Sequence, residues 1–228
     1  MVISHKKSSG EIMSKVAWSW SRLDCFEKCP RQFFERHIKK TIPFEQNDAM
    51  VRGERLHKHI ENAIKGGSYD PEIQHMVPMI EKIRGTSWDE QQVETEYALR
   101  DDMKRTSWFG KDAWCRIKMD YIGIKGSKAV TYDWKSGKNR GYSDQLKLYG
   151  GAILHLWPEI ETVETAYVFI DSKQVEKMTY YREDYQNIWD EFGERQELIQ
   201  ICNETNDWQA KPGAMACRFC PVECERRY

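Results

Sequence analysis

The residues best suited to chemistry lie in Asp133-Trp134-Lys135, within a segment that alternates like a strand. Alternate residues of a strand point to the same face, so the carboxylate and the ammonium group would share one surface. Asp120 lies on the preceding expected strand, and a hairpin would bring it beside Asp133. Two converging carboxylates suit a hard divalent ion such as Mg²⁺. Alone, this triplet usually marks a surface ion pair, and only its surroundings make it informative.

Two helical segments supply further polar side chains. Gln145 and Tyr149 are four residues apart on an expected helix and therefore occupy one face. Gly53 and His57 have the same spacing on an earlier helix, where a glycine lets a neighbouring element approach closely. By itself, a histidine of this kind is more often an ordinary core or surface residue. In chain order, however, the features read GxxxH, Asp, DxK and QxxxY.

The cysteines indicate a second chemical site near the end of the sequence. The chain has seven cysteines, an odd count, and begins without an apolar leader, so free thiols in a reducing compartment are expected. Cys217, Cys220 and Cys224 form a CxxCxxxC run whose sulfurs can wrap one metal or cluster. Four ligands are usual, and the candidates for the fourth are Cys29, Cys25, Cys202 and a histidine. This spacing does not separate zinc from an iron–sulfur cluster.

The elements that must position these residues follow from the apolar pattern. Helical spacing and capping residues predict helices over 20–38 with a break at Pro30, over 48–65 with Asp48 as cap, after Pro71, over 142–156 and over 183–203. Alternation predicts strands over 91–99, 113–124, 128–135, 161–170 and 174–181. This order indicates one mixed α/β domain, 1–228, without repeats or a linker. Its parts are a helical region of about 18–85, a catalytic core of about 90–203 and a cysteine-rich segment, 211–228.

Composition excludes several classes of protein. Of 228 residues, 40% are hydrophobic and 31% charged, which excludes a disordered chain. No uncharged apolar run approaches the ~18 residues of a membrane span. The formal net charge of −1 argues, taken globally, against a nucleic-acid binder. Locally, residues 103–151 carry 11 basic and 4 acidic side chains, and residues 152–210 carry 4 and 13. One basic and one acidic face would follow, with patchy mixed surface as the alternative.

The ordered set of motifs, with a Cys-Pro-Arg near the start and the cysteine triplet at the end, resembles the RecB-like branch of the PD-(D/E)XK nuclease superfamily. The likeness is to its cluster-bearing members, the AddB-type nucleases and CRISPR-adaptation exonucleases, and to phage exonucleases. It spans roughly residues 21–224. The resemblance implies a restriction-endonuclease-like core, in which helices flank a central mixed sheet and a metal cluster joins the N- and C-terminal segments.

The resemblance also implies roles for the polar residues. Asp120 matches the first metal-binding aspartate, although Met119 precedes it where the family has proline. Asp133 and Lys135 match the D/E-x-K motif, and His57 matches the histidine that adds a metal ligand. These residues would hold Mg²⁺ or Mn²⁺, with the backbone carbonyl of Trp134 as a further ligand, while Lys135 positions the attacking water.

Three further residues complete the expected catalytic set. Gln145 and Tyr149 match the QxxxY helix that contacts DNA and supports the site. An early strand glutamate is also expected, and Glu94 and Glu96 share a face; Glu94 is preferred. Cys29 matches the isolated first cluster ligand, with Cys25 as its competitor. The full cluster set is Cys29, Cys217, Cys220 and Cys224, implying a [4Fe–4S] cluster, with zinc the less favoured occupant.

The predicted activity is metal-dependent exonucleolytic hydrolysis of DNA, for end processing, recombination or repair. The expected contacts with DNA are Arg31, Arg52, Arg55, Lys138, Arg140 and Tyr149, and base stacking is open to Trp18, Trp20 and Trp134. A free DNA end, a recombination or helicase partner protein and no membrane are expected, in the cytoplasm of a bacterial or phage-infected cell. The alternatives are a catalytically idle cluster-bearing scaffold that binds DNA and, less favoured, a redox protein.

Overall fold

Six strands form one mixed sheet in the computed structural model, which describes residues 15–137, 144–218 and 220–226. Their order across the sheet is β2-β1-β3-β4-β5-β6. The strands are β1 (Glu90–Leu99), β2 (Arg105–Thr106), β3 (Cys115–Lys125), β4 (Lys128–Lys135), β5 (Thr162–Phe169) and β6 (Gln174–Tyr181). Only the β4–β5 pair is parallel; the other neighbouring pairs are antiparallel. The five predicted strands are present, and the short β2 is an addition.

The helices occur close to where periodicity predicts them. Those before the sheet are α1 (Trp20–Lys28), α2 (Pro30–Phe33), the π-helical η1 (Phe34–Ile38), α3 (Asp48–Ile64), the 3₁₀-helical η2 (Pro71–Met76) and α4 (Val77–Gly85). The remainder are α5 (Gln145–Leu156), η3 (Arg182–Asp184), α6 (Tyr185–Thr205) and α7 (Ala214–Arg218). Pro30 begins α2 after an extended Cys29, as the predicted break requires. The predicted cap Asp48 is wrong by one residue, because Asn47 accepts the hydrogen bond from the Met50 amide.

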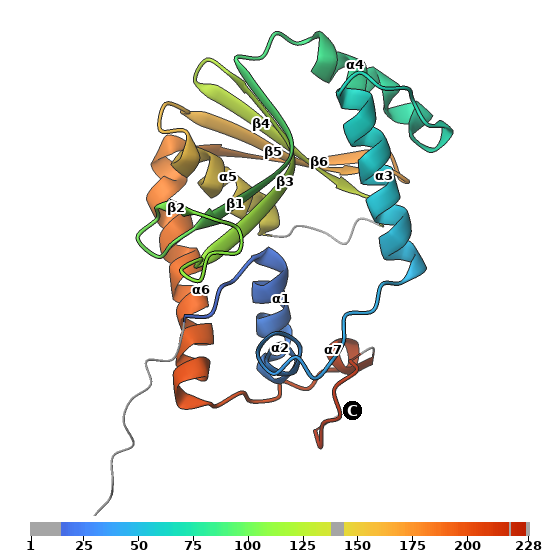
Figure 1. The fold of residues 1–228 in the computed structure, drawn as a ribbon. Coiled ribbons are helices and arrows are strands. Elements are labelled where there is room, and N and C mark those ends of the chain that lie inside the picture. The colour runs from blue at the N-terminus through green and yellow to red at the C-terminus, as the bar shows by residue number, and fades with distance from the viewer. Residues whose placement is uncertain (1–14, 138–143, 219, 227–228) are drawn as a thin grey trace, which may run out of the picture.

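Helices cover both faces of the sheet, as Figure 1 shows. One buried cluster joins α3, η2 and α4 to the face that carries Tyr121 and Trp134. A second cluster, on the other face, joins α1, α5 and α6 to residues such as Ile117 and Phe169. The observed arrangement is therefore the predicted α/β fold with a central mixed sheet flanked by helices. Because α3 and α5 belong to opposite layers, side chains from both can meet only near an end of the strands.

A local irregularity interrupts strands β1 and β3 at the same level. In β3, Ile117 packs on the α5 side, whereas Tyr121, an even number of residues later, packs on the α3 side. β1 changes in the same way between Tyr97 and Val93. Glu94 lies between them with a φ of 53°, a left-handed conformation that costs a non-glycine residue free energy. The simple alternation expected from the sequence therefore fails at Glu94 and at Asp120, which lies across from it.

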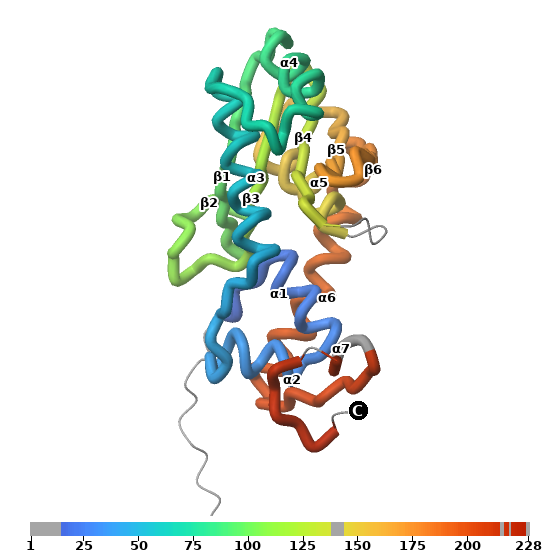
Figure 2. The backbone as a smooth tube through the Cα atoms, turned by 90° about the vertical axis from the view of Figure 1, so that its right-hand side faces the viewer, coloured from blue at the N-terminus to red at the C-terminus, as the bar shows by residue number. Residues whose placement is uncertain are grey.

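The segment that follows α6 lies beside α1 and α2, at the pole opposite α4 (Figure 2). The Lys211 ammonium group donates to the Glu27 carbonyl at 3.0 Å, and the Lys211 amide lies 3.5 Å from Cys29 Sγ. The segment after α6 thus packs against the junction of α1 and α2. In the part of the chain that the structure describes, no helix is long and apolar enough to cross a membrane.

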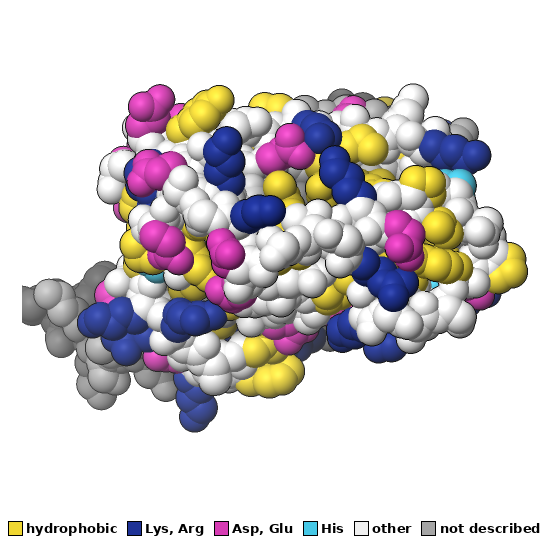
Figure 3. All heavy atoms as spheres, turned by 90° about the horizontal axis from the view of Figure 1, so that it is seen from above, with side chains coloured by type: hydrophobic (Ala, Val, Ile, Leu, Met, Phe, Trp, Pro, Cys, Tyr) yellow, Lys and Arg dark blue, Asp and Glu magenta, His cyan; other side chains and the backbone are white. Residues whose placement is uncertain are grey.

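Charged side chains are mixed on the face shown in Figure 3. Lysines and arginines are interspersed there with aspartates and glutamates, and no single-sign patch dominates that face. The charge segregation expected from the sequence blocks is therefore absent from this view. Attraction of a polyanion would therefore depend on small groups of lysines and arginines and not on one basic face.

Candidate functional site

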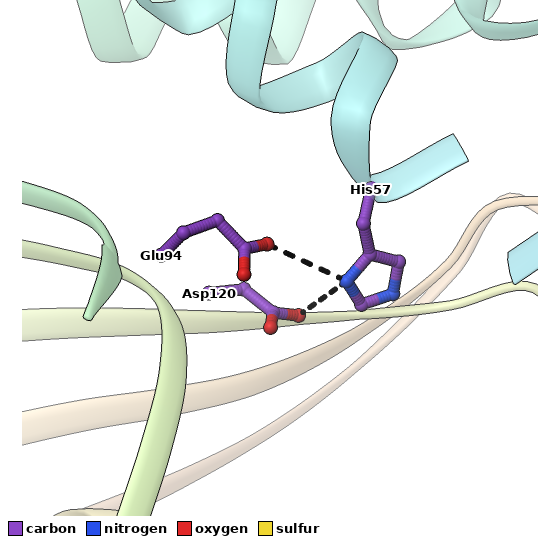
Figure 4. Close-up of side chains that lie close together, drawn as sticks. All are labelled: His57, Glu94 and Asp120. Carbon is purple, nitrogen blue, oxygen red and sulfur yellow. Dashed lines mark ion pairs between the residues drawn. The ribbon is translucent and has the colours of Figure 1, made fainter. Parts of the chain in front are cut away.

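His57, Glu94 and Asp120 converge from three elements, α3, β1 and β3, as Figure 4 shows. Their ligand atoms all lie within 4.8 Å of one another. His57 Nδ1 is 3.3 Å from Asp120 Oδ2 and 3.7 Å from Glu94 Oε1. Glu94, the residue with the left-handed backbone, is one of the three. Of the two glutamates that the sequence offered, Glu94 is brought to this group, whereas Glu96 contacts Lys118 at 4.0 Å.

The backbone of Trp134 ties this group to β4. Its amide donates to Asp120 Oδ2 at 2.9 Å, and its carbonyl accepts from His57 Nε2 at 2.7 Å. Burial disfavours the charged imidazole, but hydrogen bonds to Asp120 and Glu94 outweigh it and raise the pKa of His57 to about 10. The hydrogen bond to His57 lowers the pKa of Glu94 against the effect of its burial. The two carboxylates therefore stabilise positive charge at this point, which a bound metal ion could supply in place of the imidazole proton.

Asp133 and Lys135 form a second group on the α5 side. The Lys135 ammonium group lies 2.5 Å from Asp133 Oδ2 and donates to Gln145 Oε1 at 3.1 Å. Asp133 Oδ1 accepts hydrogen bonds from the Tyr149 hydroxyl at 2.9 Å and from Gln145 Nε2 at 3.2 Å. Tyr167 also donates to Gln145 Oε1, at 3.0 Å. The shared face predicted for Gln145 and Tyr149 is thus directed at the predicted D-x-K pair.

Burial sets the electrostatics of this second group. Desolvation raises the pKa of Asp133 to about 6, although the Lys135 charge opposes it. Burial also raises the pKa of Tyr149 well above its ordinary value, and the Asp133 charge adds to this. Tyr149 therefore remains a neutral donor that orients the Asp133 carboxylate. Only 3% of Tyr149 is exposed, which does not favour a direct contact with DNA. That contact stays a prediction.

The residues present fit a hard divalent cation. Two carboxylates and an imidazole surround one point, and the Trp134 carbonyl is next to that imidazole. Such oxygen-rich sets with one nitrogen suit Mg²⁺ or Mn²⁺. Asp133 lies outside the 4.8 Å group and faces Lys135 instead. Its expected role as a ligand alongside His57 and Asp120 stays a prediction.

Two hollows meet at the site. The first, of about 780 Å³, is lined by His57, Glu94, Asp120 and other residues of α3. The second, of about 610 Å³, is lined by Gln145, Tyr149 and residues of α1. Lys118 and Lys135 line both, so the two hollows adjoin. A Cβ on Gly53 would lie 3.1 Å from Ser136 Oγ, in agreement with the close approach predicted at that glycine.

The arginines predicted to contact DNA are engaged with carboxylates. Arg52 forms a two-pronged pair with Asp171, Arg55 pairs with Glu72, and Arg31 pairs with Glu35. Their contact with DNA stays a prediction. Lys138 and Arg140 lie outside the described residues.

The structure also decides between the predicted roles of the tryptophans. Trp134 is 1% exposed and packs between the sheet and α3. The suggestion that it stacks on bases is wrong, because its rings are already covered by the core. Trp18 is fully buried, as core packing predicts, and Trp20 is half-buried.

Sequence reasoning missed several residues that line the site. Lys118 lies 3.3 Å from Glu94 Oε2, and its position two residues before Asp120 was a usable indication. Tyr167, Arg22 and Arg116 had none, because their proximity to α5 or to each other arises from packing between distant segments. A second acidic group, His59, Asp70 and Glu72, is more open, and Glu72 already pairs with arginines.

The four predicted cluster cysteines line one pocket. Cys29, Cys217, Cys220 and Cys224 border it, together with residues 210–212 and 226. Cys25, the competing ligand, instead packs partly buried against the main core. Among the described residues, no three cysteine sulfurs lie within 4.8 Å of one another. A metal cluster joining the chain ends is therefore not shown, although the thiols face a common hollow.

Comparison with known proteins identifies the family. The sequence profile of the PD-(D/E)XK nuclease superfamily matches residues 17–116 and 116–224. The chain belongs to the PD-(D/E)XK nuclease superfamily. Asp133-Trp134-Lys135 has the D-x-K form after which the superfamily is named, and the profile match does not distinguish its RecB-like or cluster-bearing branches. No curated protein sequence matches the chain.

Two solved structures match this chain at low sequence identity. A crystal structure of a Eubacterium rectale protein provisionally assigned as an exonuclease has 14% identity and a TM-score of 0.53, covering 97% of this chain and 92% of its own. The crystal structure of SSO0001 has 13% identity and a TM-score of 0.45, covering 96% and 90%. The E. rectale structure has the same fold.

Proposed function

We propose that this PD-(D/E)XK protein is a Mg²⁺- or Mn²⁺-dependent DNA exonuclease. The observation that carries the proposal is the meeting of two groups at adjoining hollows. One is the anionic set of His57, Glu94 and Asp120, and the other is the Asp133–Lys135 pair held by α5. Metal-dependent hydrolysis of a phosphodiester requires a group that binds a divalent cation, and a fixed ammonium group beside it can orient water and neutralise phosphate charge.

The protein's own residues have distinct roles in this proposal. A bound divalent ion lowers the pKa of water and neutralises developing phosphate charge. His57, Glu94 and Asp120 would hold that ion, and Asp133 and the Trp134 carbonyl would be further ligands. Lys135, released from Asp133 toward substrate, orients the attacking water and neutralises a phosphate oxygen.

Residues from α5 hold these groups in place. Gln145 bonds to both Asp133 and Lys135, and Tyr149 donates to Asp133. This network restricts the carboxylate and the ammonium group to one arrangement, which reduces the cost of organising the transition state. Gln145 and Tyr149 therefore act as positioning residues.

Several features support DNA and an end-directed action. Lys118 and Lys135 lie at the junction of the two hollows, where they would attract a polyanion despite the net charge of −1. The similar E. rectale structure bears a provisional exonuclease assignment. DNA with a free end is thus the proposed substrate, and a recombination or helicase partner remains part of the same proposal.

The deciding experiment uses end-labelled linear DNA and covalently closed circular DNA, each with Mn²⁺ and with EDTA. We expect Mn²⁺-dependent degradation of linear DNA only. Lys135→Ala should abolish it, whereas Lys128→Ala, at the exposed far end of the same strand, should not. Nicking of circles would make the protein an endonuclease. Binding without cleavage by the intact protein would favour the catalytically idle scaffold.

We also propose that the cysteine pocket holds a [4Fe–4S] cluster. The four thiols line one hollow, yet no three described cysteine sulfurs lie within 4.8 Å. Around one tetrahedral zinc ion, with Zn–S bonds of about 2.3 Å, sulfurs would be about 3.8 Å apart. A cluster, in which each thiolate binds a different iron, spreads them wider. The wider spacing favours iron–sulfur over zinc, and such a cluster persists in the reducing compartment that the free thiols suggest.

The cluster proposal is tested on protein purified without oxygen. Iron, acid-labile sulfide and zinc are measured together with visible absorption. About four irons and four sulfides per chain would support the cluster. Stoichiometric zinc in colourless protein would reject it.

A further inference from the structure

The second hollow has a wall that the proposed chemistry does not use. This aromatic–basic wall comprises Trp20, Arg22, Trp108, Phe109 and Arg116, from α1, the loop before β3 and β3 itself. The hollow of about 610 Å³ lies in the range of sites that enclose small ligands. Since Lys135, Gln145 and Tyr149 line its other side, any occupant would adjoin the candidate catalytic groups.

Arg22 and Arg116 are two like charges held close together. Each donates to a backbone carbonyl, Arg22 to Ala17 at 2.8 Å and Arg116 to Trp108 at 2.7 Å. Within the described residues, no carboxylate pairs with either guanidinium group. Burial, followed by the neighbouring Arg116 charge, lowers the pKa of Arg22. Unpaired, partly buried cations in this arrangement favour an anion between them.

The aromatic residues present rings beside these cations. Trp20 is held under the Arg195 guanidinium group, 5.7 Å from its ring centroid. Trp108 is tied to β3 through its carbonyl, which anchors the loop next to it. Phe109 follows at the tip of a turn closed by the Gly110 amide and the Ser107 carbonyl, and it is 88% exposed. An exposed phenyl ring beside the two guanidinium groups can stack on the flat face of a nucleic-acid base.

We propose that the aromatic–basic wall binds an unpaired segment of DNA that adjoins the scissile phosphate. Arg22 and Arg116 contact a backbone phosphate, and Phe109 and Trp108 stack on bases. Bases offer their faces in this way only when they are unpaired and unstacked, so a rigid duplex would not fill the wall. The inference rests on the proposed nuclease function and specifies the strand state of the substrate.

The test measures equilibrium binding in EDTA, so that cleavage plays no part. Fluorescence anisotropy follows a labelled oligothymidylate of about 12 nucleotides, within the range of single-strand sites, and a blunt duplex of the same length. The variants are Phe109→Ala and Arg116→Gln. Phe44→Ala, an exposed ring elsewhere, and Lys111→Ala, an exposed cation in the same loop outside the pocket lining, are matched controls. Thermal unfolding checks that each variant is folded.

We expect single-strand binding tighter than duplex binding. Phe109→Ala should weaken it about tenfold, as loss of one stacked base does. Arg116→Gln should weaken it and reduce the slope of log affinity against log salt by about 0.7, one phosphate contact. Arg116→Lys retains the charge and should retain the slope, which distinguishes lost contact from a disturbed loop. Both controls should bind like the parent.

Two results would overturn the inference. One is unchanged single-strand affinity in both Phe109→Ala and Arg116→Gln; the other is duplex binding as tight as single-strand binding. Neither depends on catalysis. A protein that binds the single strand through this wall but degrades no DNA would reject the nuclease proposal alone. A protein that degrades DNA without using the wall would reject only this inference.

Discussion

The catalytic candidate and the cysteine pocket are built in different ways. The first lies on β1, β3 and β4, inside the sheet, with α3 and α5 packed on opposite faces. Its polar side chains bond to one another and to the Trp134 backbone. The second lies between the start of α2 and the last segment of the chain, which carries the five-residue α7. The hydrophobic core holds the first region in place, whereas the stability of the second depends on the metal or cluster that its thiols bind.

This contrast separates activity from stability. A change in the sheet site should remove chemistry and leave the fold, because two buried clusters surround the site independently of its charges. A change in the cysteine pocket should weaken the fold and leave the sheet site intact. Variants in the two regions test that division.

The largest effect is expected at Asp133. Asp133→Asn removes the negative charge but keeps an oxygen that can accept from Tyr149, so DNA cleavage should fall by on the order of 1,000-fold with little change in melting temperature. Initial rates with Mn²⁺ and thermal unfolding measure the two parts. Asp190→Asn, an exposed aspartate on α6, is the control. Cleavage within tenfold of the parent rate would contradict the assignment.

The next effect concerns the cysteine pocket. Cys29→Ala should lose iron and lower the melting temperature by about 10 °C, because a link across nearly the whole chain contributes about 4 kcal/mol. Cys25→Ala, four residues earlier and outside the pocket lining, should keep its iron. Iron content and unfolding are measured under anaerobic conditions. Iron retained in Cys29→Ala, or lost only in Cys25→Ala, would reverse the choice of ligand.

A smaller effect is expected from protons at the sheet site. The pKa of His57 is raised to about 10, so a proton must leave before the imidazole can bind a metal ion. Between about pH 6.5 and 8.5, apparent Mn²⁺ affinity should therefore rise about tenfold per pH unit. Calorimetric titration measures it, and His57→Gln should remove this dependence. A flat profile in the parent protein would exclude His57 as a ligand.

The smallest effect is expected in the backbone of β1. Glu94 has a φ of 53°, which glycine adopts without strain, so Glu94→Gly should be more stable than Glu94→Gln by about 1 kcal/mol. Both variants lose the carboxylate, so their difference reports the backbone alone. Urea unfolding measures it. A less stable glycine variant would show that the kink carries no strain.

Local sequence patterns predicted much of the architecture. The strands around Asp120 and Asp133, the break at Pro30 and the helix that carries Gln145 and Tyr149 all follow from apolar spacing and from proline. These are short-range properties, because a strand or helix pattern repeats within a few residues. The motif order also predicted the residues that the structure gathers near β4.

The surroundings of other residues depend on long-range packing. Base stacking was open to Trp134 from its sequence, but β4 lies in the middle of the sheet and the ring is buried. Arg52 and Arg55 looked free for DNA, yet Asp171 and Glu72 reach them from other elements. Asp171 lies 119 residues after Arg52 in the chain, and no local pattern indicates a partner at that separation.

For this protein, the sequence by itself determined the order of strands and helices, the D-x-K pair and the superfamily to which the chain belongs. Only the tertiary structure decided that Glu94 joins His57 and Asp120, that Cys29 rather than Cys25 borders the cysteine pocket, and that Arg22 meets Arg116. The physical reason is the same in each case. Periodicity fixes which face a side chain occupies, but packing between layers and a kink at one backbone position determine which faces meet.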